Sequence, residues 1–134
     1  MIGTDKNNYI IGRSFSVKKL GINTAAGILD IINTILVATS WFVIGFAAIG
    51  EAGGAKGATS GAATFYYIFV GVGLILHIIG LLKSRKAGIS ITGHILGIIG
   101  TGIFLLSPAL ALGTFVLLII AAVFTLKQSP VASK

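Results

Sequence analysis

Three ionisable residues lie inside long apolar stretches of this chain: Asp30, His77 and His94. An acid at the centre of a membrane helix costs about 2.5–3.5 kcal/mol on insertion scales. Asp and His side chains inside membranes form proton and ion pathways, and the proton equilibrium of histidine lies near neutral pH. Together with Asn33, these residues form a candidate intramembrane polar site.

Two other interpretations of the same residues stay open. Asp30 is either protonated or paired with His77, His94 or a lysine, and the cluster then only fixes how the helices pack. Two histidines and one aspartate could also bind a metal, but they come from separate apolar runs with no local ligand spacing. We therefore predict neither a metal site nor a cofactor.

The apolar run that carries Asp30, residues 22–49, has one polar face. Helical spacing of three, four and seven residues places six residues on this face: Asn23, Gly27, Asp30, Asn33, Thr34 and Val37. A membrane helix needs only about 20 residues, so this run predicts a tilted or protruding helix.

Composition indicates a membrane protein. Of the 134 residues, 55% are hydrophobic and only 10% are charged, whereas a soluble domain has about 25% charged residues. Four apolar runs predict an all-α, integral membrane four-helix bundle within one domain, residues 21–126. The expected helices cover about 22–49, 62–82, 87–106 and 109–126.

The boundaries of these runs carry helix-breaking and flanking signals. Ser107-Pro108 separates the last two runs, because proline lacks an N–H and disfavours helical geometry at the preceding residue. Residues 50–61 are small and glycine-rich, and predict a polar loop. Residues 1–20 are expected to form a cytoplasmic or interfacial N-terminal segment, and residues 127–134 a cytoplasmic tail.

Charge predicts the orientation in the membrane. Of the ten Lys and Arg residues, only Lys56 falls on the outer side when the N-terminus is inside. This asymmetry follows the positive-inside rule. We expect both termini to be cytoplasmic in a multi-pass protein of the cell membrane, the cytoplasmic membrane of a bacterium.

Glycines at helical spacing predict close helix packing. Gly73 and Gly80 share a face with His77, and Gly93 is four residues before Gly97. Small residues at such spacing let helix backbones approach in lipid. The sequence leaves open whether these faces pack within the chain or against a protein partner or a second copy.

Several function classes find no support. The chain has no cysteine, no P-loop and no nucleophile-elbow pattern, so we expect no enzymatic activity. Basic residues flank the apolar runs instead of lining one face, so nucleic-acid binding is not expected either.

Residues 85–100, RKAGISITGHILGIIG, resemble the glycine-rich helical hairpin of small, largely uncharacterised four-helix membrane proteins of bacteria. The resemblance covers residues 85–126 and implies an integral membrane protein with no assigned activity. Length and helix count are also similar to those of small multidrug exporters and fluoride channels, but the motifs of those families are absent and no site is transferred.

Two functions follow as hypotheses. The first is a small polytopic protein that acts through helix–helix packing, as an accessory or structural subunit of a membrane complex or as a self-protection protein. The alternative is a small oligomeric transporter or channel that moves a cation or proton past Asp30, His77 and His94.

Overall fold

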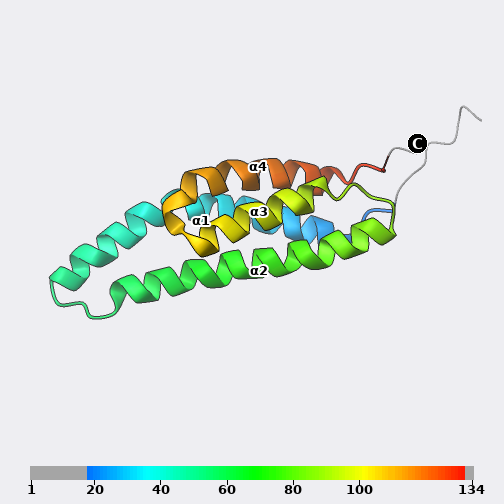
Figure 1. The fold of residues 1–134 in the computed structure, drawn as a ribbon. Helices are drawn as coiled ribbons and strands as arrows, with labels where there is room; N and C mark the ends of the chain where they lie inside the picture. Colours follow the sequence, from blue (N-terminus) through cyan, green and yellow to red (C-terminus); the bar gives the residue numbers. More distant parts are fainter. Residues whose placement is uncertain (1–17, 132–134) are drawn as a thin grey trace, which may run out of the picture.

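The computed structural model describes residues 18–131, and it is an all-α protein of four helices (Figure 1). The helices are α1 (Gly21–Ala52), α2 (Ala58–Lys86), α3 (Thr92–Leu106) and α4 (Ala111–Lys127), with a short 3₁₀ helix, η2 (Pro108–Leu110), before α4. Residues 1–17 of the predicted N-terminal segment lie outside the described residues. The last three residues of the predicted tail, 132–134, lie outside them too.

Three helices are long and apolar enough to cross a membrane: α1, α2, and η2 with α4. Helix α3 is apolar but has only 15 residues, a length of about 22 Å. Large apolar side chains cover the outside of the bundle, among them Ile35, Leu82 and Ile119. This arrangement, with polar residues inside and apolar residues outside, suits a lipid environment.

Helix α3 begins at Thr92, five residues later than the predicted start at residue 87. Gly88 adopts a left-handed backbone conformation, with φ of 66°, which glycine tolerates because it has no Cβ. Ile89 then pairs with Pro130 in an antiparallel bridge. This pairing, remote in sequence, takes residues 87–91 out of the helix. The end of α3 is as predicted: Ser107 is extended before Pro108.

The loop predicted at residues 50–61 is shorter, because both flanking helices extend into it. The chain turns through residues 53–57, where Gly54 and Gly57 have positive φ. The Glu51 carboxylate accepts a hydrogen bond from the Thr59 backbone N–H at 3.1 Å. This bond satisfies one of the N–H groups that the first turn of a helix leaves free, so residues 58–61 can be helical.

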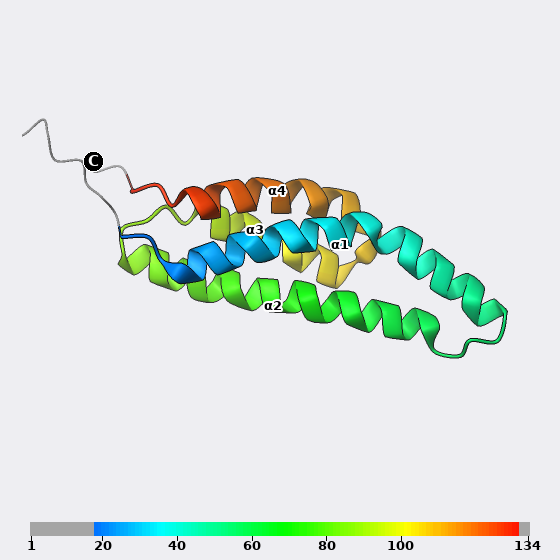
Figure 2. The ribbon, with the colours of Figure 1, turned by 180° about the vertical axis from the view of Figure 1, so that it is seen from behind.

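The interior of the bundle has a polar half and an apolar half. Buried apolar side chains cluster toward the turn between α3 and α4, and they are Val37, Tyr66, Val70, Phe104, Ala111 and Leu118. Most buried polar side chains lie in the half toward the described ends of the chain, whereas Ser40 and Thr114 lie beside the apolar cluster. Figure 2 shows that α1 and α2 also continue past the α3–α4 turn as a two-helix projection.

Candidate functional site

A chain of hydrogen bonds connects three helices inside the bundle. Asp30 Oδ1 lies 2.7 Å from His77 Nε2, and His77 Nδ1 lies 3.2 Å from His94 Nδ1. His94 Nε2 lies 3.1 Å from Asn23 Oδ1. The Asn23 amide then donates to Ser84 Oγ at 2.7 Å. We call these five residues the buried chain.

Helical periodicity explains how the buried chain is assembled. Asn23 and Asp30 are seven residues apart on α1, and His77 and Ser84 are seven residues apart on α2, so each pair shares one helix face. The face predicted for α1 is confirmed, since all six of its residues are buried. His94, on α3, lies between the two pairs.

All members of the buried chain are removed from solvent. Asp30 and His77 have no exposed surface, and His94 is 1% exposed. Polar groups removed from water in this way need hydrogen-bond partners, since each unpaired one costs several kcal/mol in lipid. The contacts answer one question that the sequence left open: Asp30 contacts His77, and none of the described lysines contacts it.

Two glycines make room for the imidazole rings. A Cβ atom on Gly97 would overlap the His77 ring, and one on Gly80 would overlap the His94 ring. The two histidines therefore lie where a facing helix has no side chain. Interhelical hydrogen bonds and small residues act together here, as in many membrane helix packings.

Asn33 lies apart from the buried chain. Its amide donates to the Phe69 backbone carbonyl at 3.3 Å, and its Nδ2 lies 2.7 Å from the position of a Cβ on Gly73. Within the described residues, Asn33 Oδ1 and Asp30 Oδ2 have no hydrogen-bond partner. Asn33 thus contributes to α1–α2 packing, one helical turn from Asp30.

The four predicted packing glycines all contact other helices of the same chain. Besides Gly73, Gly80 and Gly97, Gly93 lies against Thr125 of α4. These contacts join α2 to α1, α2 to α3, and α3 to α4. Partner binding through these particular glycines would have to displace helices of the bundle.

Sequence reasoning missed Ser84 and did not place Asn23 in the site. A signal for Ser84 was present, because Gly73, His77 and Gly80 share one helix face. Ser84 follows Gly80 by four residues and therefore lies on the same face. Asn23 was on the predicted polar face of α1, but it lies seven residues from Asp30. The two residues are connected only through His77 and His94, which the sequence of α1 does not indicate.

The buried chain has a fixed number of protons. Its three bonds between Asp30, His77, His94 and Asn23 each require one proton. The Asn23 amide nitrogen donates to Ser84, so its oxygen accepts from His94. Three protons on these groups correspond to a neutral acid with two neutral imidazoles, or to a carboxylate with one imidazolium and one neutral imidazole.

Both proton distributions leave the buried chain with no net charge. They differ only in the position of protons within the existing hydrogen bonds. Reversing the Asn23 amide would leave two protons and a net negative charge inside the bundle, which a low-dielectric interior disfavours. The arrangement can therefore shift a proton between Asp30 and the two histidines without creating a net buried charge.

Within residues 18–131, no group of three or more His, Cys, Asp or Glu residues is arranged to hold a metal ion. Comparison with protein-family models, with curated proteins and with solved structures gave no match.

Proposed function

We propose that this chain is a multi-pass protein of the cell membrane, the bacterial cytoplasmic membrane, with both termini cytoplasmic. Its function is to bind a partner protein as an accessory subunit. Support comes from the ends of α1 and α2 that continue past the α3–α4 turn (Figure 1), residues 42–65, which we call the arm.

The arm extends beyond the depth of the hydrocarbon in this orientation. About 20 helical residues cover the roughly 30 Å of a bilayer core, and counting from Gly21 they reach Trp41. Trp41 lies at the same level as the α3–α4 turn, since it lines one hollow together with Pro108. Residues after Trp41 therefore lie at or beyond the outer interface.

Large apolar side chains remain uncovered on this arm. Phe42, Phe46 and Ile49 are 69%, 71% and 69% exposed, and their spacing of four and three residues places them on one stripe of α1. A contiguous apolar stripe outside the hydrocarbon marks a contact surface. This stripe is the observation that carries the proposal.

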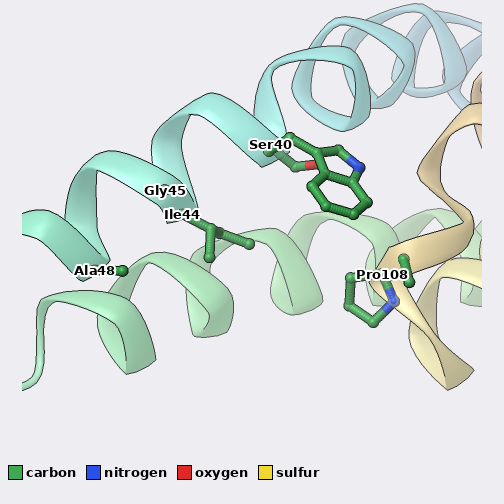
Figure 3. Close-up of a pocket in the computed structure, with 7 residues that line it drawn as sticks. Ser40, Ile44, Gly45, Ala48 and Pro108 are labelled. Atoms are coloured by element: carbon green, nitrogen blue, oxygen red, sulfur yellow. The ribbon is translucent and has the colours of Figure 1, made fainter.

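An apolar hollow of about 300 Å³ at the base of the arm adds a second contact surface. Figure 3 shows Ser40, Ile44, Gly45 and Ala48 of α1 on one side of it and Pro108 on the other. The small residues Gly45 and Ala48 would let a partner helix approach the α1 backbone closely.

Photo-crosslinking in native membranes tests partner binding. A photoreactive phenylalanine analogue at Phe46 should give a discrete protein adduct. The same analogue at Ile119, an exposed position on α4 away from the arm, should give only lipid adducts and serves as the matched control. Equal adduct patterns at the two positions, or a lone monomer at both, would contradict partner binding through the arm.

The buried chain supports proton transfer as a second candidate function. Its proton-sharing bonds join Asp30, His77 and His94, and the Asn23 amide connects His94 to Ser84 near the basic ends of the helices. Carboxyl and imidazole groups in direct hydrogen-bond contact exchange protons, which favours protons over other cations. The apolar cluster fills the other half of the bundle, so a proton at Asp30 leaves by the same end unless the helices move.

Proteoliposomes with an imposed pH gradient test this candidate. The wild-type chain should dissipate the gradient, and Asp30→Asn should abolish this flux because asparagine has no carboxyl group to exchange a proton. Glu51→Gln is the control, since Glu51 is the exposed acid in the arm. Flux unchanged by Asp30→Asn would rule out a proton path through this residue.

A further inference from the structure

Six basic residues gather at the end of the bundle opposite the arm. They flank the start of α1 and the ends of α2 and α4, which lie together in Figures 1 and 2. All are exposed: Lys18, Lys19, Lys83, Arg85, Lys86 and Lys127. We call this group the basic face.

The basic face has no acidic counterpart among the described residues. Asp30 is buried inside the bundle and Glu51 lies in the arm at the far end. Among the described residues, the carboxyl group of Asp30 contacts His77, and no described acid contacts these six cations. Six positive charges with no acid among them create a strong local field for anions.

Helix dipoles explain only part of this charge. Lysines and arginines in the last turns of α2 and α4 compensate the negative ends of those helix dipoles. Lys18 and Lys19, however, precede α1, where the dipole is already positive, and the first turn of α1 has no acidic residue. A role in helix stability therefore leaves these two lysines unexplained.

Hydrogen bonds hold the parts of the basic face together. The Gln128 side chain accepts from the Leu20 N–H at 2.7 Å and donates to the Leu20 carbonyl at 3.3 Å. Lys19 and Lys127 are the sequence neighbours of this pair, so their backbones are fixed beside each other. The Ser90 N–H also donates to the Ser129 carbonyl at 2.8 Å, which ties the α2–α3 turn to the same assembly.

We propose that the basic face binds the phosphate of anionic phospholipid headgroups. Exposed apolar residues lie directly next to the cations, with Leu82 before Lys83, and Phe124 three residues before Lys127. A lipid can place its acyl chains on these apolar side chains and its phosphate among the cations. Basic groups beside membrane helices recognise anionic lipids in this way, and Arg85 adds a bidentate donor.

This inference rests on the proposed membrane insertion but not on the proposed partner binding. The full chain is reconstituted into vesicles of phosphatidylcholine and phosphatidylglycerol, extracted in mild detergent, and analysed by native mass spectrometry for retained lipid. We expect selective retention of phosphatidylglycerol that weakens at high salt.

Charge-removing variants locate the binding. Each lost cation should weaken retention about fivefold, so the triple variant Lys83→Gln, Arg85→Gln, Lys86→Gln should retain about a hundredfold less phosphatidylglycerol. Lys56→Gln removes the one cation of the arm turn and should change nothing. If the triple variant does not fold, the double variant Lys19→Gln, Lys127→Gln decides, with an expected loss of about twenty-five-fold.

Three results would overturn the proposal. One is equal retention in wild-type and charge-removing variants, and another is a loss of retention in Lys56→Gln. Displacement of the lipid by equimolar glycerol phosphate would show a site for soluble phosphates instead of lipid headgroups. Flotation of the washed vesicles reports insertion separately, and failure to float would contradict the membrane location itself.

Discussion

The proton count implies that an uncharged asparagine can replace Asp30 without loss of a hydrogen bond, which would not hold for a simple ion pair. Asparagine at this position can donate its amide N–H to His77 Nε2, and two neutral histidines then complete the same three hydrogen bonds. Leucine has no polar atom and leaves His77 Nε2 buried without a partner. The two substitutions therefore separate hydrogen bonding from proton exchange.

We predict that Asp30→Asn changes the free energy of unfolding by no more than about 1 kcal/mol, whereas Asp30→Leu lowers it by about 1–3 kcal/mol. Denaturant titration in detergent, followed by circular dichroism, measures both. If both variants are equally and strongly destabilised, Asp30 is held by its negative charge and not by the hydrogen-bond chain.

A second prediction concerns the glycines beside the imidazole rings. In Gly97→Ala the added methyl group overlaps the His77 ring, and overpacking of this kind costs about 1–3 kcal/mol. Gly102→Ala is the control on the same helix, because no atom lies within 4 Å of its Cβ position. It should stabilise α3 by up to about 1 kcal/mol through its higher helix propensity.

Thermal unfolding of the purified chain measures both glycine variants, which should shift the midpoint in opposite directions. If the unfolding midpoint decreased equally in both variants, the cause would be the loss of helix flexibility at these positions. The overlap with the His77 ring would then not explain the effect.

At the scale of elements, the helices follow from local pattern, and their connections do not. Apolar runs and Ser107-Pro108 predict four helices and the break before α4. Nothing local indicates that the segment after Lys127 pairs with Ile89 and shortens α3. That contact depends on the tertiary packing that brings the ends of α2 and α4 together.

Gln128 tests the connection between the end of α4 and the start of α1. It has a left-handed backbone, with φ of 48°, and its side chain bonds to Leu20 and Thr24. Gln128→Ala and Gln128→Gly both remove these bonds, but only alanine keeps the backbone strain, which costs about 1–2 kcal/mol. We predict that the alanine variant is less stable than the glycine variant by about that amount.

Amide hydrogen exchange at Leu20 provides the second measurement for this prediction. Exchange should accelerate in both Gln128 variants, because the Leu20 N–H loses its acceptor. Unchanged exchange at Leu20 would show that the ends of α1 and α4 are held together without this side chain.

At the scale of the whole molecule, charge asymmetry predicts the orientation. The chain has no cysteine, so single cysteines report topology without interference. Ala55→Cys, in the arm turn, should react with a membrane-impermeant maleimide added to intact cells. Ala87→Cys, after the basic end of α2, should react only after permeabilisation. The opposite pattern would invert the proposed orientation, and labelling of both in intact cells would exclude insertion as a four-helix bundle.

The sequence alone determined the apolar runs, the polar face of α1 and the charge asymmetry, because these properties depend on residue type and helical period. Tertiary structure decided which polar groups meet. His77 and His94 are 17 residues apart, and only the close approach of α2 and α3 at Gly80 and Gly97 brings their rings together. Such contacts depend on helix rotation and depth, which no local pattern specifies.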